Sequence, residues 1–237
     1  MNAAAAAETL GLIEREGGKG LNLALDVTHE EDFIAAAELL KAQWGGVDVV
    51  VNNAGVATSG LIEASALADW EWVLNINLLG VVRGCKTFAP MFKAAGSGHF
   101  INIASFAGIA NPPGMGSYNV AKAGVVSLSE TLRLELAEFG VGVTVVCPAF
   151  FPTNLMNSAR MQNQGTVGMV HKLMKNSGVT AEDVAAQIIR AVQQKQFLLL
   201  THKDTRMQAL VKRIAPERFF KLMQKSTAGM LRQAKAP

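Results

Sequence analysis

Short apolar runs alternate along the chain with longer stretches that carry apolar residues at helical spacing. The short runs predict strands at Leu21–Leu25, Val47–Val51, Phe100–Ala104, Val141–Cys147 and Phe197–Thr201. The longer stretches predict helices at Ala3–Arg15, Thr28–Trp44, Leu67–Leu79, Val81–Ala94, Ser117–Phe139 and Ala181–Gln194. Strands that alternate with helices indicate an α/β fold with a doubly wound parallel sheet.

Two local signals set helix boundaries near the N-terminus. Gly17 and Gly18 follow the alanine-rich first stretch and are expected to end its helix. Thr28 with Glu31 three residues later has the spacing of a capping box, so we expect Thr28 to cap the second helix.

The best candidate for chemistry is Tyr118, the only tyrosine of the chain, with Lys122 four residues later. On a helix, this spacing places both side chains on one face, where the ammonium group would favour the phenolate form of Tyr118. Ser105 ends the strand that begins near Phe100, and a loop rich in Gly and Pro leads from it to the Tyr118 helix. Most Tyr-x-x-x-Lys pairs simply lie on a surface helix, so the pair alone does not identify a site.

Three further motifs change that assessment. Asn52-Asn53-Ala54-Gly55 follows an apolar strand, Asn77 lies within Asn75–Gly80, and Pro148–Thr153 follows the strand that ends at Cys147. In this order and spacing, the chain from about Leu21 to Thr201 resembles the short-chain dehydrogenase/reductase family, which has a Rossmann-like fold.

The resemblance implies hydride transfer between a nicotinamide cofactor and a carbonyl or secondary alcohol. It implies that Tyr118 exchanges the substrate proton, Lys122 lowers the pKa of Tyr118 and holds the nicotinamide ribose, and Ser105 orients the substrate oxygen. It further implies that Asn77 supports a water-linked proton path to Lys122. Without the other three residues, Asn77 would be an ordinary helix asparagine bonded to backbone.

The resemblance also implies a set of cofactor contacts for NAD or NADP. These are Asp26, Val27, Asn53, Ala54, Gly55, Tyr118, Lys122, Pro148, Phe151 and Thr153. Asp26 could equally be a solvated carboxylate at a strand end, and Asn53–Gly55 a plain turn. Ala149 departs from the family pattern, which has glycine there; if that position needs a positive φ, alanine would be strained.

One unit of the family is missing from the sequence. We expect a strand, a Gly-rich turn, a helix and a second strand before Leu21, and Gly17–Gly20 lies in the wrong context to be that turn. The fold is therefore predicted to be N-terminally truncated, without a helix N-terminus for the cofactor pyrophosphate. The exposed edge of Val47–Val51 must pair again, borrow a strand from another chain, or belong to an incomplete sequence, which is the favoured interpretation. If the fold survives as it stands, we expect Leu21–Leu25 to move in and pair with Val47–Val51. NAD and NADP are not distinguished.

Charge divides the chain into two predicted parts. Residues 203–237 contain nine Lys/Arg and two Asp/Glu, a net charge of +7, which leaves −4 for residues 1–202 because the whole chain carries +3. We expect residues 1–202 to form the catalytic domain and residues 203–237 a basic amphipathic helical extension. The extension could lie on a membrane surface, but covering the body or a partner subunit is the favoured interpretation.

Composition narrows the class of protein. Half of the 237 residues are hydrophobic and 17% are charged, as in a globular domain. No apolar run approaches a membrane span, no secretion signal is evident, and Cys85 and Cys147 form no disulfide framework, so we expect a cytoplasmic protein. None of the four scattered histidines indicates a metal site, and we expect no nucleic-acid partner.

The segment Asn154–Ser177 is the predicted substrate lid. It contains Met156, Met161, Met169 and Met174 with Val167, Val170 and Leu173. Flexible thioethers suit an apolar substrate of variable shape, although ordinary packing of a mobile flap explains them as well. The favoured function is an NAD(P)-dependent oxidoreductase that acts on an apolar carbonyl or alcohol as a homodimer or homotetramer. The alternative is a non-catalytic relative of the family that acts in assembly.

Overall fold

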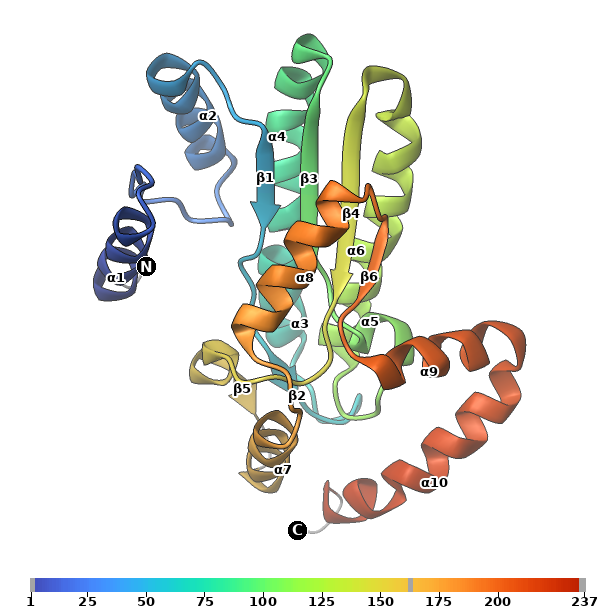
Figure 1. The fold of residues 1–237 in the computed structure, drawn as a ribbon. Helices are drawn as coiled ribbons and strands as arrows, with labels where there is room; N and C mark the ends of the chain where they lie inside the picture. Colours follow the sequence, from blue (N-terminus) through green and yellow to red (C-terminus); the bar gives the residue numbers. More distant parts are fainter. Residues whose placement is uncertain (1–2, 162–163, 235–237) are drawn as a thin grey trace.

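A parallel four-stranded sheet forms the centre of the protein (Figure 1). The computed structural model describes residues 3–161 and 164–234. The strand order is β1 (Val49–Asn52), β3 (Gly98–Ile103), β4 (Val141–Cys147) and β6 (Leu198–Leu200). The predicted α/β class and parallel sheet are confirmed, because β1–β3, β3–β4 and β4–β6 all pair in parallel.

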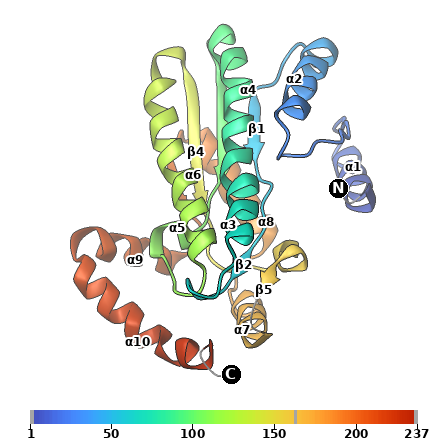
Figure 2. The ribbon, with the colours of Figure 1, turned by 180° about the vertical axis from the view of Figure 1, so that it is seen from behind.

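Helices cover the two faces of the sheet unequally. On one face lie α3 (Leu67–Leu74), α4 (Gly80–Ala95) and α6 (Gly116–Glu135), and α6 is followed by a 3₁₀ turn at Ala137–Phe139 (Figure 2). On the other face, α8 (Ala181–Gln193) crosses β3 and β4 (Figure 1). A capping box between Thr180 and Asp183 fixes the start of α8. The main core forms between the sheet and the first group of helices, around Phe92 and Phe100.

The predicted helices at 67–79 and 81–94 are one nearly continuous helix with a wide turn in it. Residues Asn75–Leu79 form a π-helical turn between α3 and α4. A π turn adds a residue to one turn of the helix and often occurs at functional sites. This turn contains the candidate residue Asn77, which is completely buried.

The N-terminal part contains two helices beside the sheet and no strand. The helix α1 (Ala3–Arg15) is followed by Gly17, with a left-handed φ of 77°, and α2 is Glu30–Trp44. The prediction that Leu21–Leu25 is a strand paired with Val47–Val51 is wrong, since the segment forms no ladder and β1 pairs only with β3. An extended segment becomes a strand only where a partner lies within hydrogen-bonding distance. Figure 1 shows a gap between this segment and β1.

Thr28 does not cap α2, which corrects the capping-box prediction. The N-cap is His29, without a side-chain cap, and the Thr28 hydroxyl donates to Asp26 Oδ1 at 2.7 Å. Asp32 instead accepts the backbone N–H of Asp26 at 2.7 Å. The three acidic residues of the first turn, Glu30, Glu31 and Asp32, favour the helix start through the helix dipole.

Smaller elements gather at the carboxyl end of the sheet, where the site lies. They are α5 (Ala107–Ala110), the two-residue strands β2 (Thr58–Ser59) and β5 (Arg160–Met161), the 3₁₀ turn Asn154–Ser158, and α7 (Gln164–Lys175). β2 and β5 pair in parallel and join the lid to the body. Arg160 reinforces this junction by pairing with Asp69 at 2.9 Å and stacking over Trp72 at 3.9 Å.

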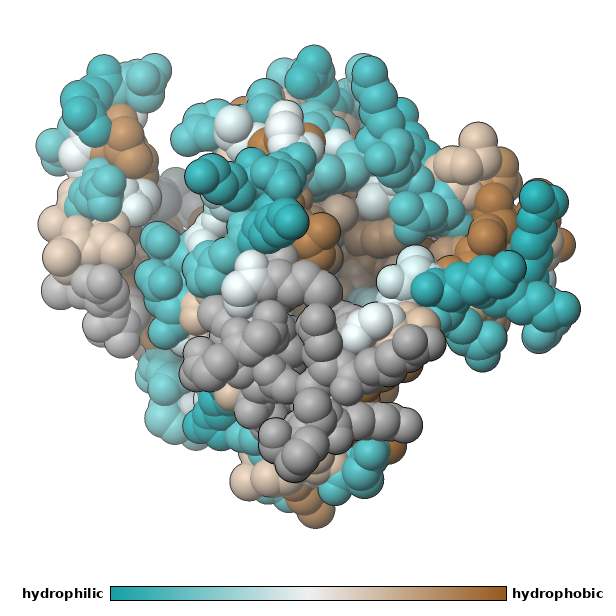
Figure 3. Space-filling model, turned by 90° about the horizontal axis from the view of Figure 1, so that it is seen from below, coloured by the Kyte–Doolittle hydropathy of each residue, from teal (hydrophilic) through white to brown (hydrophobic). Residues whose placement is uncertain are grey.

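The C-terminal extension is helical and packs on the body. It comprises α9 (Lys203–Ile214) and α10 (Pro216–Ala234), and its Phe219 is buried in the main core. Apolar and hydrophilic side chains lie next to one another on the surface of the molecule seen in Figure 3. Within residues 3–161 and 164–234, no helix is long and apolar enough to cross a membrane.

Candidate active site

A cavity of about 1290 Å³ lies at the carboxyl ends of β1, β3 and β4. Its walls come from the loops after these strands, the start of α6, the lid and the extension. Nine of the predicted site residues line it: Asn53, Ala54, Gly55, Ser105, Tyr118, Lys122, Pro148, Phe151 and Thr153. Residues that are more than 90 positions apart in the sequence therefore meet in one cavity, at the place where open α/β sheets bind ligands.

Ser105 and Tyr118 are brought together by close packing of α5 against α6. A Cβ atom on Gly108 would lie 2.5 Å from the backbone carbon of Lys122, so only glycine permits this approach. The Ser105 hydroxyl also accepts the backbone N–H of Ala107 at 3.1 Å, which fixes its orientation at the start of α5. Ser105 is half-buried, whereas Tyr118 is buried.

Lys122 lies one helical turn beyond Tyr118 and is buried in the cavity wall. Its Nζ donates to the backbone oxygen of Ile103 at 2.8 Å, at the end of β3. Burial lowers the pKa of Lys122 to about 8, because the charged form loses its water. The Nζ atom lies 5.9 Å from the centre of the Tyr118 ring.

The predicted depression of the Tyr118 pKa is wrong in this structure. Burial raises the pKa of Tyr118, and this effect exceeds the lowering by its hydrogen bond with Ser105. The charged phenolate would have to form at a buried position, while the Lys122 Nζ donates to Ile103. Tyr118 is therefore a neutral phenol at neutral pH, which suits it to donate a proton.

Asn77 does not line the cavity but supports its floor. Its amide accepts the backbone N–H of Val56 and donates to the backbone oxygen of the same residue, both at 2.8 Å. A Cβ atom on Gly55 would lie 3.3 Å from Asn77 Oδ1 and 3.6 Å from Lys122 Nζ, so the three residues are close neighbours. The backbone-bonded arrangement is what an ordinary helix asparagine would show, and the proton path through Asn77 stays a prediction.

A buried polar chain holds α6, and with it Tyr118, against the sheet. Asn52 on β1 donates to Asn102 Oδ1 on β3 at 2.8 Å, and Asn102 donates to Ser129 Oγ on α6 at 3.0 Å. Ser129 then donates to the Val125 backbone oxygen at 2.7 Å. Buried polar groups of this kind are stable only when each finds a partner. The sequence analysis missed this network, although Asn52 belongs to a motif that it used.

The loop after β4 has an ordinary backbone at Ala149. The described non-glycine residues with positive φ are Asn111 and Lys195, so Ala149 carries no left-handed strain. The Pro148 oxygen accepts the backbone N–H of Phe106 at 2.8 Å, directly after Ser105. The alanine that departs from the family pattern is therefore accommodated.

Asp26 and Val27 lie apart from the cavity. Asp26 is exposed, and hydrogen bonds from Thr28 lower its pKa. Val27 packs against Gly80, and its backbone oxygen accepts a hydrogen bond from Arg83 at 2.9 Å. Neither residue is among those that line the cavity, and their role toward an adenine group stays a prediction.

The sequence analysis missed the contribution of the extension to the cavity. His202 after β6, Asp204, Thr205 and Gln208 of α9, and Met223 of α10 all line it. Of the predicted lid residues, Met156, Met161, Val170, Leu173 and Met174 also line it. The side chains of Val167 and Met169 lie outside the described residues. No local signal shows that α10 folds back to this cavity, because only long-range packing brings it there.

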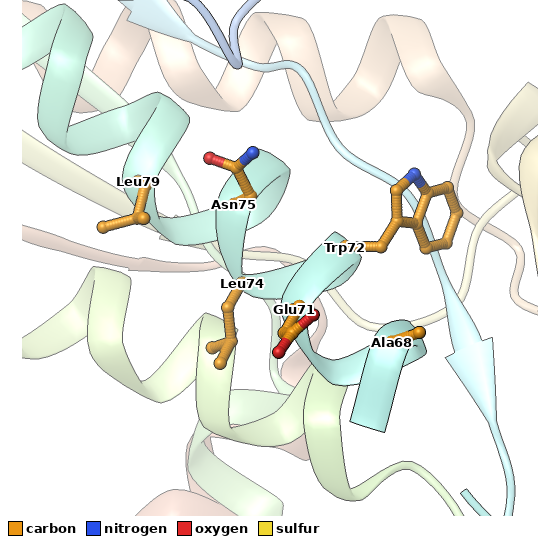
Figure 4. Close-up of a pocket in the computed structure, with 6 residues that line it drawn as sticks. All are labelled: Ala68, Glu71, Trp72, Leu74, Asn75 and Leu79. Atoms are coloured by element: carbon orange, nitrogen blue, oxygen red, sulfur yellow. The ribbon is translucent and has the colours of Figure 1, made fainter. Parts of the chain in front are cut away.

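A second hollow, of about 540 Å³, lies beside α3 and the π turn (Figure 4). It is lined by Ala68, Glu71, Trp72, Leu74, Asn75 and Leu79. None of the catalytic candidates lines it.

Comparisons with known proteins agree with this geometry. The family described as "short chain dehydrogenase" matches residues 1–164. The chain is 32% identical over 198 residues to "Probable oxidoreductase EphD" of Mycobacterium tuberculosis, covering 80% of this chain and 33% of that protein. It thus spans about a third of the length of this relative. It is 27% identical over 235 residues to "C alpha-dehydrogenase" of a Sphingobium species, covering 91% and 77%.

A solved structure shows the same fold. A short-chain dehydrogenase/reductase from Burkholderia phymatum, in complex with NAD, superimposes with a TM-score of 0.84 and 30% identity. The match covers 91% of this chain and 83% of that one. The chain therefore belongs to the short-chain dehydrogenase/reductase family.

Proposed function

We propose that the protein interconverts an apolar ketone and its secondary alcohol with a nicotinamide cofactor, NAD or NADP. The observation that carries this proposal is the meeting of Ser105, Tyr118 and Lys122 in one cavity with Asn53–Gly55 and the Pro148–Thr153 loop. The acid Tyr118, the orienting hydroxyl of Ser105 and the Lys122 ammonium group then border one cavity. The two backbone segments border the same cavity, where the nicotinamide ring can approach them.

In the reducing direction, Tyr118 donates its proton to the carbonyl oxygen of the substrate. Its raised pKa keeps it neutral and ready for this step. The Ser105 hydroxyl, fixed at the start of α5, donates a hydrogen bond to the same oxygen and orients the carbonyl. The Lys122 ammonium stabilises the phenolate that remains after the transfer. In the oxidising direction, the phenolate of Tyr118 must take up the proton of the alcohol.

The residues of the cavity fit the nicotinamide and ribose half of the cofactor. Asn53, Ala54 and Gly55 leave room at the end of β1, Lys122 offers an ammonium group, and Pro148, Phe151 and Thr153 border the same cavity. The chemistry that the cofactor supplies when bound is hydride transfer. Among the described residues, no Gly-rich turn joins a strand to a helix beside β1. These residues therefore provide no such helix N-terminus to bind the pyrophosphate next to the nicotinamide half of the site.

The lining of the cavity supports an apolar substrate. Five methionines from five different segments border it: Met115, Met156, Met161, Met174 and Met223. Thioethers on flexible chains adapt to bulky apolar molecules. Ser105 and Tyr118 contribute polar groups to the lining, and so do Asp204, Thr205 and Gln208 on α9. We therefore favour an apolar substrate whose reactive oxygen lies at Ser105 and Tyr118.

We also propose a cytoplasmic homo-oligomer built through the helices α3, α4 and α6. Cys85 and Cys147 are free and buried, which agrees with a reducing compartment. The outer face of α6 exposes Val120 and Leu134, and Leu79 is exposed beside the hollow of Figure 4. Apolar residues on adjoining helices suit a two-fold interface.

Leu134→Glu tests the interface. Leu134 is 79% exposed, so the substitution should leave the fold intact and disrupt only contacts between copies. Light scattering should show a dimer or tetramer for the native protein and a lower mass for the variant. A native monomer at micromolar concentration would contradict the proposal.

Tyr118→Phe tests the reaction. A panel of apolar ketones would be assayed with NADH and with NADPH at concentrations that saturate the nicotinamide site. We expect the variant to lose about 10²–10⁴-fold in kcat/KM, because only the transition state needs the proton. Ser105→Ala serves as the companion variant and should lose less, because it removes an orienting group and keeps the acid. A Tyr118→Phe protein that retains more than about a tenth of native kcat/KM would reject the role of Tyr118.

A further inference from the structure

His202 joins the end of β6 to the loop after β4. It is the residue that precedes α9, with φ −110° and ψ 138°, and its side chain borders the cavity. The ring faces the loop that contains Pro148, Ala149 and Phe150, some 50 positions earlier in the sequence. The sequence analysis gave this histidine no role.

The hydrogen-bond partners of the ring define one tautomer. Nε2 lies 3.1 Å from the backbone oxygen of Phe150, which can only accept, so Nε2 must carry the proton. Nδ1 lies 3.4 Å from the backbone N–H of Ala149, which can only donate, so Nδ1 must be bare. The Thr201 hydroxyl, 2.8 Å from Nδ1, can also donate to it. A neutral imidazole protonated on Nε2 satisfies all three contacts at once.

The loop that His202 contacts is tied on its other side to the catalytic serine. The backbone oxygen of Pro148 accepts the N–H of Phe106, the residue directly after Ser105. The loop is therefore held between α5, which orients Ser105, and the ring of His202. Pro148, Phe151 and Thr153 of this loop border the cavity together with Tyr118 and Lys122.

We propose that His202 is a positioning residue that fixes the Pro148–Thr153 loop in the conformation that receives the nicotinamide group. This inference rests on the proposed function for the identity of the ligand, but not for the position of the loop. It also explains how Ala149 is tolerated. The ring binds the N–H of Ala149 and the oxygen of Phe150, so side-chain contacts hold the turn while the backbone at residue 149 keeps a negative φ.

Three substitutions at His202 separate the two backbone contacts. His202→Phe keeps a flat ring and removes both. His202→Asn offers a carbonyl oxygen near the Nδ1 position, so it can still accept from Ala149, and His202→Gln offers an amide near the Nε2 position, so it can still donate to Phe150. Thr201→Val is the matched control, because it removes the hydroxyl contact of the ring and leaves both loop contacts in place. The backbone oxygen of His202, which accepts from the Thr205 hydroxyl, is present in every variant.

The first measurement needs no cofactor. Hydrogen–deuterium exchange of the peptide that contains residues 148–153 should become about tenfold faster in His202→Phe, as expected for the loss of two hydrogen bonds. His202→Asn and His202→Gln should lie between, and Thr201→Val near the native rate. Nitrogen-15 spectra of the ring should show the tautomer protonated on Nε2. Native exchange rates in a folded His202→Phe protein, or a ring protonated on Nδ1, would overturn the inference.

The second measurement separates this inference from the proposed function. With turnover established, His202→Phe should raise the KM for NADH or NADPH about tenfold and change kcat less, because the variant weakens positioning and keeps the acid. Partial rescue by His202→Gln would support positioning through Phe150. An equal fall in kcat for all variants, with KM unchanged, would overturn the inference. If no variant and no native protein turns over a nicotinamide cofactor while the exchange result holds, the proposed function fails and the positioning of the loop stands.

Discussion

The two sides of the sheet differ in how well neighbouring strands and helices cover them. The closed side comprises β3 and β4, and the open side is the edge at β1. At β3 and β4, both neighbours are present, helices cover both faces, and Asn102, Thr144 and Val145 are completely buried. At β1, one edge has no partner strand among the described residues, and Val49 and Val51 are 45% and 52% exposed. The closed side positions Ser105, Tyr118 and Lys122. The open side is where the remainder of a dinucleotide would have to bind.

This difference indicates that the positions of Tyr118 and Lys122 depend mainly on the closed side. Tyr118 and Lys122 are held by α6, which is fixed through Asn102 and Ser129 and by the close contact at Gly108. Asn52 is the one link of this network that comes from β1. The reacting end of the site can therefore be well ordered while the neighbouring edge stays exposed.

Matched substitutions on the two sides should give the largest contrast in stability. Val145→Thr places a hydroxyl in the closed side without changing the shape, and we expect it to cost about 1–3 kcal/mol of unfolding free energy. Val51→Thr makes the same change on the open side and should cost less than about 0.5 kcal/mol. Urea unfolding of both variants checks this. Equal losses would mean that the β1 edge is covered in solution.

The pH dependence of stability should reveal the burial of Lys122 on the closed side. Its pKa is lowered from 10.5 to about 8 in the folded protein, so the unfolded chain holds more of this proton between these two values. The Lys122 contribution to unfolding free energy should therefore rise with pH in this window, by about 1 kcal/mol per pH unit. Lys122→Met supplies the reference, and urea unfolding at several pH values gives the difference.

Below pH 8, the difference between the two proteins should become nearly constant, because Lys122 is then charged in both states. A native protein that loses stability relative to Lys122→Met as pH rises through this window would contradict the burial of the ammonium group.

The sequence predicted the closed side well because its signals are local. Apolar runs gave β1, β3, β4 and β6 to within about two residues at each end, the uncertainty inherent in assigning boundaries. The spacing of Tyr118 and Lys122 gave their shared face, since both border the cavity. Helical periodicity gave α3 and α4 as helices, although it could not show the π turn between them, which contains Asn77.

The failures concern properties that depend on distant neighbours. Leu21–Leu25 has the composition of a strand but finds no partner, and the pKa of Tyr118 is set by burial that no local pattern records. The roles of His202 and Met223 in the cavity arise only when the extension folds back over the carboxyl end of the sheet.

The contrast between the two sides is tested most directly by comparing the binding of a half cofactor with that of the whole. Calorimetric titration of the 237-residue chain with reduced nicotinamide mononucleotide, NADH and NADPH measures what the adenosine half adds. If only the nicotinamide half of the site is formed, NADH and NADPH should bind within about tenfold of the mononucleotide, a difference of about 1.4 kcal/mol, and more weakly than micromolar. Micromolar binding of either dinucleotide, about a hundredfold tighter than the mononucleotide, would contradict the account.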